Sequence, residues 1–319
     1  MSEENGVFLA FDTSNYTTSC AVCDLGGRVI ASKKKLLPVK EGERGLRQSD
    51  ALFHHTAALP EMTDGIRETL CGKTVLAVGA SERPRDADGS YMPCFLAGKS
   101  AAHAAAASCG AEYFGFSHQC GHIAAALYSA GREELYGKEF AAFHVSGGTT
   151  DILLCSPGRQ HPFEVTRIGG TLDINAGQAI DRAGVAMGLR FPCGPELEKL
   201  AAAYEGEIPK LRLSVHGLEC NLSGIENKAL EMYRSCGDRC AVAATVIDFV
   251  SRTLEALTKE LLTRYPDIPI VYAGGVMSCG IIKQRLGAYG SFSAPEFSSD
   301  NAAGVALMTR REYLKDHKA

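Results

Sequence analysis

The sequence contains no apolar run that approaches the roughly 18 consecutive residues of a membrane-spanning helix. It also lacks a secretory signal pattern and any cysteine spacing typical of a disulfide framework, although it contains 12 cysteines. Cys20 and Cys23 form a CxxC, but in the strand predicted there their side chains face opposite sides. These absences favour a reducing compartment, so we expect a cytoplasmic protein with no membrane partner.

The charge balance lacks the positive excess that most nucleic-acid-binding proteins carry. The 33 lysines and arginines and 37 acidic residues give a formal net charge of -4. An RNA partner would therefore have to be held locally. Positive side chains do cluster in one stretch, at Lys33, Lys34, Lys35, Lys40, Arg44 and Arg47.

A repeated strand pattern indicates two similar units. Segments 7–14, 18–23 and 28–32 predict a three-strand meander, and segments 140–145, 150–155 and 163–168 predict another. A helix over 49–70 should kink or split at Pro60, and His103, in an apolar helix over 94–109, is expected in the core. The order is similar to a ribonuclease-H-like unit, in which helices flank a mixed five-stranded sheet. We therefore predict an α/β protein of two such domains with a cleft between them.

Two histidines provide the first candidate for chemistry. His118 and His122 are four residues apart at the start of a predicted helix, so both imidazoles project from one face and can reach one metal ion. Histidines in the core or on the surface of a helix can also fall at this spacing. The pair alone therefore leaves the choice open.

Three glycine-rich turns follow predicted strands or helices. They lie at 146–150, 191–195 and 273–276, where a backbone without side chains can approach a phosphate or an adenine. Each turn alone is weak evidence, because a simple hairpin or helix end explains it better than ligand binding does. Asp181, on a predicted helix over 173–187, is either a surface carboxylate paired with Arg182 or a group that accepts hydrogen bonds from ribose hydroxyls.

Taken together, these motifs resemble one family over nearly the whole chain. The chain is similar to the transferase subunits of tRNA threonylcarbamoyladenosine synthase, glycoprotease-like members of the actin-like ATPase superfamily, and we interpret it as a divergent paralogue. The motifs that carry the resemblance are, in order, Asp12-Thr13-Ser14, His118 and His122, Ser146-Gly147-Gly148, Thr171-Leu172-Asp173, Asp181-Arg182, Pro192 to Pro195, Leu222-Ser223-Gly224, Gly274-Gly275-Val276 and Asp300-Asn301-Ala302-Ala303.

The resemblance implies two actin-like subdomains and two sites. The subdomains would be 1–117, completed by a C-terminal helix at 301–319, and 118–300, which carries a helical insertion. His118, His122 and Asp300 would bind one divalent metal, Fe(II) or Zn(II). ATP or an acyl-adenylate would be held by a second set of residues: Val145, Ser146, Gly147, Gly148, Thr149, Asp181, Gly194 and Cys279.

The resemblance also implies the reaction and the partners. A threonylcarbamoyl group would pass from threonylcarbamoyl-AMP to the adenosine beside the tRNA anticodon, with metal-dependent positioning and without an enzyme nucleophile, so no catalytic side chain is assigned. The partners would be tRNA, an acyl-adenylate-forming enzyme and accessory subunits, in a homodimer or heteromer.

Several positions depart from the family pattern. Tyr16 replaces an acidic residue, Thr149-Thr150-Asp151 follows the Ser-Gly-Gly turn, and Gln178 and Cys279 replace a glutamate and an asparagine. Glu82-Arg83-Pro84-Arg85 stands in place of a Gly-Pro-Gly loop. The alternative is thus a non-catalytic or altered-substrate paralogue that binds nucleotide and metal as a partner or regulatory subunit. A metalloprotease is disfavoured because Gln119 stands where an HExxH motif needs a glutamate.

Overall fold

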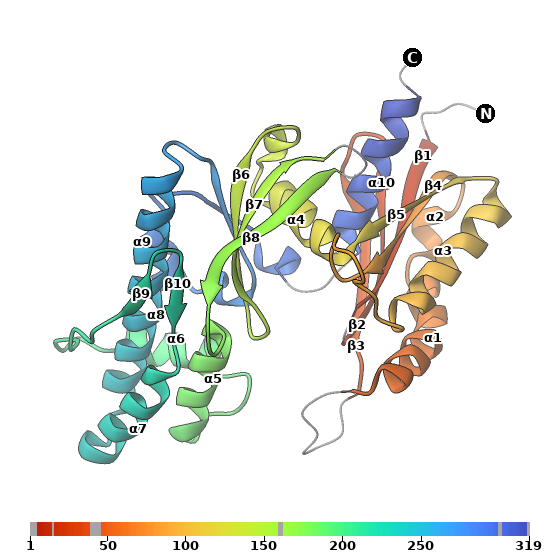
Figure 1. Cartoon of the computed structure of the whole chain (residues 1–319). Helices are drawn as coiled ribbons and strands as arrows, with labels where there is room; N and C mark the ends of the chain where they lie inside the picture. The colour runs from red at the N-terminus through yellow and green to blue at the C-terminus, as the bar shows by residue number, and fades with distance from the viewer. Residues whose placement is uncertain (1–4, 15, 39–45, 159–161, 299–301, 318–319) are drawn as a thin grey trace. The chain divides into compact units, whose positions relative to one another are not determined.

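The computed structural model describes residues 5–14, 16–38, 46–158, 162–298 and 302–317. The chain forms two compact units: Met1–Tyr128 with Pro157–Glu164 and Ser299–Ala319, and Ser129–Ser156 with Val165–Ser298. In each unit helices flank a mixed sheet, which confirms the predicted fold class (Figure 1). The first unit extends beyond residue 117, the boundary predicted from the sequence, and includes the helix that follows.

The sheet of the first unit has the predicted five strands in the order β3-β2-β1-β4-β5 among the described residues. β1, β2 and β3 are antiparallel neighbours, whereas β4 and β5 run parallel to β1. The carboxyl ends of β1, β4 and β5 therefore meet at one edge, where ligand sites of open α/β sheets lie. The strands are β1 (Gly6–Ser14), β2 (Thr17–Asp24), β3 (Val29–Leu36), β4 (Thr74–Arg83) and β5 (Glu112–Ser117).

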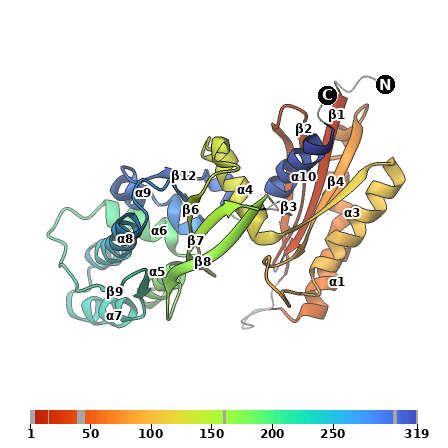
Figure 2. The same cartoon turned by 45° about the horizontal axis from the view of Figure 1, so that its top comes forward.

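Helices cover both faces of this sheet. α1 (Gln48–Asp64), α2 (Arg67–Leu70) and α3 (Phe95–Cys109) lie on one face and α10 (Ala303–Asp316) on the other, as the two views in Figures 1 and 2 show. α4 (His118–Ser129) follows β5 directly. No helix of the described residues is long and apolar enough to cross a membrane.

Two predictions for these helices were wrong in detail. α1 continues through Pro60 and ends at Gly65, whose N–H donates to the carbonyl of Glu61, so the break comes five residues after the proline. His103 is not in the core; it is exposed and stacks on Tyr113 with 3.7 Å between ring centroids.

The CxxC of β2 has the geometry predicted for a strand. Cys20 Sγ lies 3.2 Å from the Met62 carbonyl of α1, and Cys23 Sγ lies 3.3 Å from the Ala306 carbonyl of α10 on the other face. Both thiols are free and fully buried, and burial raises the pKa of each to about 12. They are therefore core residues, which excludes a reactive thiolate pair.

The second sheet has seven strands among the described residues, two more than predicted, in the order β12-β11-β6-β7-β8-β10-β9. The additional pair is a short hairpin, β9 with β10, that extends the sheet beyond β8. The strands are β6 (Phe140–Val145), β7 (Thr150–Pro157), β8 (Phe163–Thr171), β9 (Ser214–His216), β10 (Glu219–Asn221), β11 (Ile270–Ala273) and β12 (Ser291–Phe292).

The helices of the second unit share one large core with this sheet. α6 and α7 were not predicted. The long α8 has 14 buried residues, of which 10 belong to the hydrophobic core. The helices are α5 (Ala176–Ala186), α6 (Gly194–Ala202), α7 (Gly224–Cys236), α8 (Arg239–Arg264) and α9 (Gly280–Leu286), with short 3-10 turns at Glu133–Leu135, Gly275–Ser278 and Pro295–Phe297.

A close contact between α4 and α10 gives a test of the first unit. A Cβ built at Gly304 would lie 1.9 Å from the Gly121 carbonyl oxygen, whereas a Cβ at Gly121 would come no closer than 3.2 Å to Val305. Gly304→Ala should therefore lower the free energy of unfolding by about 2 kcal/mol, and the matched control Gly121→Ala by less than about 1 kcal/mol. Urea unfolding of the two variants measures this difference. Equal stabilities would contradict the observed helix contact.

Candidate functional site

The two candidate metal-binding histidines lie together at the start of α4. His118 is the first residue of the helix and His122 follows one turn later, so both lie on the same face. Their Nε2 atoms are 2.9 Å apart. Two imidazoles that bind one ion at ~2.0–2.1 Å place their nitrogens at roughly this separation. The pair therefore fits half of a metal site.

A buried carboxylate orients the first of these histidines. Asp12, at the end of β1 and 1% exposed, places Oδ2 2.7 Å from His118 Nδ1. Burial by itself raises the pKa of Asp12, but the charge on His118 and hydrogen bonds from His118, Ser81 and Ser14 outweigh it and hold the pKa below its usual range. A carboxylate at Nδ1 favours a proton there and leaves the lone pair of Nε2 for a metal.

The third metal ligand predicted from the sequence, Asp300, lies outside the described residues. Within the described part of the chain, no group of three or more His, Cys, Asp and Glu side chains is arranged to hold a metal. The structure therefore brings together two of the three predicted ligands. It adds Asp12 as the partner of His118, a role that the sequence did not reveal.

The second candidate site is a pocket of about 270 Å³ within the second unit. It brings together four predicted ligand-binding residues, Gly147, Asp181, Gly194 and Cys279, from four separate segments. Its apolar wall comes from α5, α8 and the proline-rich turn before α6. The remaining lining residues are Gly177, Ile180, Pro192, Pro195, Glu198, Ile247, Gly275, Val276 and Ser278.

The Ser-Gly-Gly turn enters this pocket only through Gly147. Ser146 Oγ accepts hydrogen bonds from the amides of Gly148 (3.2 Å) and Thr149 (3.1 Å), so both amides are directed at the turn itself. The start of α5 packs against the turn so closely that a Cβ at Gly177 would lie 2.7 Å from Gly147. These two amides could donate hydrogen bonds to a phosphate, as predicted, only if they no longer donated to Ser146 Oγ.

Val145, another predicted pocket residue, has a supporting role. It is fully buried and packs against Gly274, where a Cβ would lie 2.3 Å from the Val145 carbonyl oxygen. Gly274 has a φ of 102°, a conformation that favours glycine. This close approach joins the ends of β6 and β11 and places the Gly275–Ser278 turn on the pocket.

Two carboxylates supply the charge of the pocket. Asp181 accepts a hydrogen bond from the Cys193 amide at 2.8 Å, and burial raises its pKa against the effect of that amide. Glu198 was missed from the sequence. Its Oε1 accepts a hydrogen bond from the Gly280 amide at 2.6 Å. The spacing of Gly194 and Glu198, four residues apart at the start of a helix, is the signal that could have found it.

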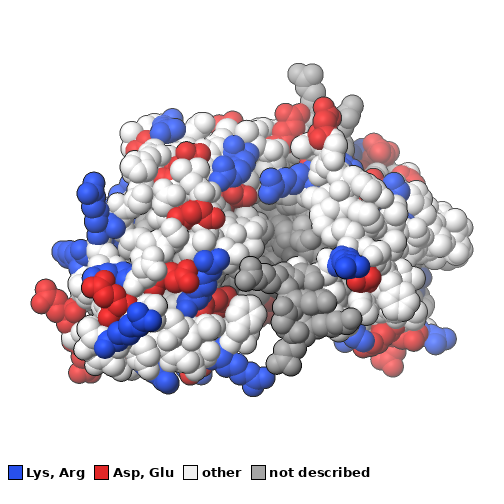
Figure 3. All heavy atoms as spheres, turned by 60° about the horizontal axis from the view of Figure 1, so that its bottom comes forward, with Lys and Arg blue, Asp and Glu red and all other residues white. Residues whose placement is uncertain are grey.

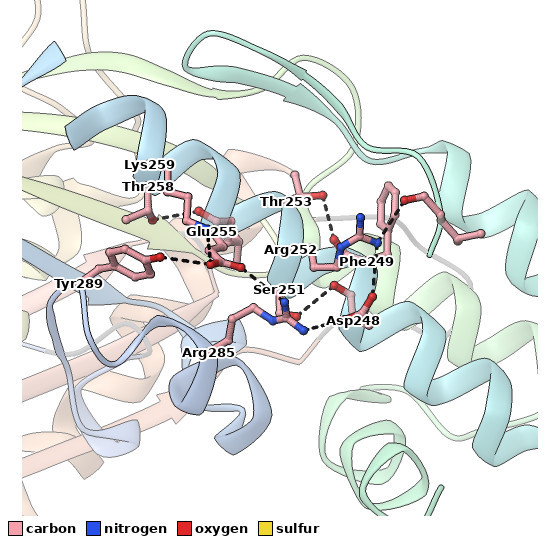
Figure 4. A network of polar contacts seen from close by, with 12 residues as sticks. Asp248, Phe249, Ser251, Arg252, Thr253, Glu255, Thr258, Lys259, Arg285 and Tyr289 are labelled. Atoms are coloured by element: carbon pink, nitrogen blue, oxygen red, sulfur yellow. Dashed lines mark hydrogen bonds and ion pairs between the residues drawn. The ribbon is translucent and has the colours of Figure 1, made fainter. Parts of the chain in front are cut away.

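An ionic network fastens α9 to α8 and so supports the pocket wall (Figure 4). Asp248 of α8 accepts a hydrogen bond from Arg285 of α9 at 2.7 Å, and Arg285 also lies 3.4 Å from Glu255. Asp248 directly follows Ile247, a pocket residue, and α9 begins directly after Cys279. The network therefore fixes two segments that line the pocket.

Two residues that depart from the family pattern, Gln178 and Cys279, have defined roles in this structure. Gln178 closes a capping box at the start of α5, in which its Oε1 accepts from the Asn175 amide at 3.0 Å. Glutamine and glutamate can both fill this position, so the substitution keeps the cap. Cys279 is 9% exposed, and burial raises its pKa. It is therefore a neutral thiol in the pocket wall.

Comparison with known proteins identifies the family. Residues 73–307 match the family model described as tRNA N6-adenosine threonylcarbamoyltransferase. The chain belongs to this family. The enzyme of that name from Streptococcus pneumoniae (strain ATCC 700669 / Spain 23F-1) is 30% identical, with 98% of this chain and 94% of the relative covered. The one from Methanopyrus kandleri is 27% identical, with 89% and 81% covered.

Solved structures share the fold at low sequence identity. Component A of (R)-2-hydroxyglutaryl-CoA dehydratase from Acidaminococcus fermentans has a TM-score of 0.54 at 12% identity, covering 96% of this chain and 98% of that one. A ROK family glucokinase from Streptomyces griseus, solved with glucose and AMPPNP, has a TM-score of 0.52 at 14% identity, covering 96% of this chain and 100% of that one. These likenesses concern the fold alone.

Proposed function

We propose that this chain transfers a threonylcarbamoyl group from threonylcarbamoyl-AMP to the adenosine beside the anticodon of tRNA. The observation that carries the proposal is the family match over residues 73–307, together with a pocket that unites Gly147, Asp181, Gly194 and Cys279. The chemistry of the pocket supports a nucleoside ligand, because the apolar walls could contact a base while the two carboxylates could accept hydrogen bonds from ribose hydroxyls.

A divalent metal, Fe(II) or Zn(II), is part of the proposal. His118 and His122 would hold it, with Asp12 orienting the first imidazole and Asp300 as the further ligand predicted from the sequence. When bound, the metal would supply positive charge that stabilises a phosphate. Because a side-chain nucleophile is not required, the residues of the chain would act by positioning the two substrates.

The tRNA would be held by local contacts. On the face shown in Figure 3, lysines and arginines are interspersed with aspartates and glutamates. Lys33, Lys34 and Lys35 are exposed on the edge strand β3, where Lys35 pairs with Glu61. Lys40 and Arg44 of the predicted positive cluster lie outside the described residues. The proposal also includes an acyl-adenylate-forming enzyme and accessory subunits as partners.

The second candidate function is a nucleotide- and metal-binding subunit without transferase activity. It is favoured by Cys279, a buried neutral thiol in place of an asparagine. A thiol lacks the side-chain amide that could bind a substrate phosphate or carbonyl. The assay described below distinguishes the two functions.

The first prediction concerns the metal. The purified protein should bind about one Fe or Zn per chain, and His118→Ala or His122→Ala should remove most of it, because each substitution deletes one ligand. Elemental analysis of the three proteins measures the occupancy. Full occupancy in both variants would show that the metal site lies elsewhere.

The second prediction concerns the pocket. Asp181→Ala should weaken the binding of ATP or a threonylcarbamoyl-AMP analogue by about tenfold to a hundredfold, since losing a hydrogen bond to a charged group costs ~1.5–3 kcal/mol. Isothermal titration calorimetry gives the affinities. Asp248→Asn, which alters the network behind the wall, serves as a control for indirect effects. Unchanged affinity in Asp181→Ala would remove this residue from the ligand site.

The third prediction tests the transferase function itself. Given threonylcarbamoyl-AMP, tRNA and partner subunits, the wild-type chain should modify tRNA slowly, and Tyr16→Asp with Cys279→Asn should raise the rate. A misplaced positioning group can cost ~100-fold in rate without abolishing the reaction. Mass spectrometry of digested tRNA detects the product. If neither protein forms product while both still bind metal and nucleotide, the non-catalytic subunit is the correct function.

A further inference from the structure

The segment that follows β4 contacts the first turn of α4. The Pro84 carbonyl accepts a hydrogen bond from the Gln119 amide at 3.1 Å, and Ser117 Oγ accepts one from the Cys120 amide at 3.3 Å. The first amides of a helix have no partner within the helix. Here two of them are satisfied by the segment after β4 and by the residue before the helix.

Asp86 joins this segment to the helix. Its Oδ2 accepts hydrogen bonds from Ser117 Oγ at 2.6 Å and from Cys120 Sγ at 3.1 Å. Its Oδ1 accepts two from Arg83, at 2.9 Å from Nε and 2.6 Å from Nη2. The carboxylate is 15% exposed. One charged group thus binds the end of β4, the end of β5 and the first turn of α4.

These contacts surround the candidate metal ligands. Ser117 immediately precedes His118, and Cys120 lies between His118 and His122 on the same helix. Asp12 orients the His118 ring, but the backbone of the first turn is fixed by the Pro84 carbonyl and Asp86. Binding sites require their groups to be held within ~0.5 Å of the productive geometry. Fraying of this turn would separate the two imidazoles.

We infer that Asp86 is a positioning residue for the His118–His122 pair. The inference rests on the metal site of the proposed function. It concerns a segment in which this chain departs from the family pattern, since Glu82-Arg83-Pro84-Arg85 stands in place of a Gly-Pro-Gly loop.

Glu82 offers a matched control. It lies near the end of β4, where its carboxylate accepts hydrogen bonds from Tyr113 of β5 at 2.8 Å and from Lys99 of α3 at 2.9 Å and lies 3.5 Å from Arg83 Nη1. These partners are not in α4. Glu82→Gln should therefore disturb the segment to a similar degree without moving the histidines.

The experiment measures the affinity of the full chain for Zn²⁺ alone, by competition with a chelator, together with urea unfolding. Asp86→Ala should weaken Zn²⁺ binding about tenfold, in the range found for groups that support metal ligands. Glu82→Gln should leave the affinity within about twofold of wild type. Adding Ser117→Ala to Asp86→Ala should weaken binding further, because Ser117 Oγ also accepts the hydrogen bond from the Cys120 amide.

The controls separate the failure of this inference from failure of the proposed metal site. If wild type and His118→Ala bind Zn²⁺ equally, the proposed metal site is wrong. If the histidines are required but Asp86→Ala binds as tightly as Glu82→Gln, the positioning role is overturned. If Asp86→Ala does not fold, Asp86→Asn replaces it, since the amide keeps the size of the side chain but removes the negative charge that pairs with Arg83. A several-fold loss of Zn²⁺ affinity in that variant supports the inference, and an unchanged affinity overturns it.

Discussion

The buried carboxylate of Asp12 is the constraint on which the first unit depends. A charged group in the core is costly unless hydrogen bonds satisfy it. Asp12 obtains them from Ser14 of its own strand, Ser81 of β4 and His118 of α4. The ends of β1 and β4 and the start of α4 must therefore meet at one point, and that requirement brings the candidate metal ligands to the edge of the sheet.

In the second unit, close backbone contacts determine which segments surround the pocket. The start of α5 packs directly on the Ser-Gly-Gly turn at Gly177, and β11 packs on β6 at Gly274. Neither contact leaves room for a side chain. Because these elements approach so closely, the turn, Asp181 and the segment before α9 surround one pocket. Its shape depends on the absence of side chains as much as on the residues that line it.

The substituted positions of this family member show how a structure can absorb divergence. Gln178 preserves a helix cap, and Asp86 provides hydrogen bonds at the start of α4. Cys279 keeps an apolar wall but removes an amide. Gln178 and Asp86 maintain the framework, whereas Cys279 lies in the pocket wall, where it can contact a ligand.

The sequence by itself determined the local features. The alternation of side chains along β2 placed Cys20 and Cys23 on opposite faces of the sheet. The four-residue spacing of His118 and His122 placed both on one face of α4. Strand and helix geometry fix such relations within a few residues. Composition and the strand order were sufficient for the fold class. The β9–β10 hairpin and α6 were missed because short elements in an insertion give weak periodic signals.

Only the tertiary structure decided which distant groups meet. Asp12 contacts a histidine 106 residues away, and Glu198 contacts the Gly280 amide 82 residues away. Ser146 Oγ accepts hydrogen bonds from the Gly148 and Thr149 amides, which were predicted from the sequence to bind a phosphate. Such contacts depend on how whole elements pack and on the need to satisfy buried polar groups, so they cannot be predicted from a local sequence pattern.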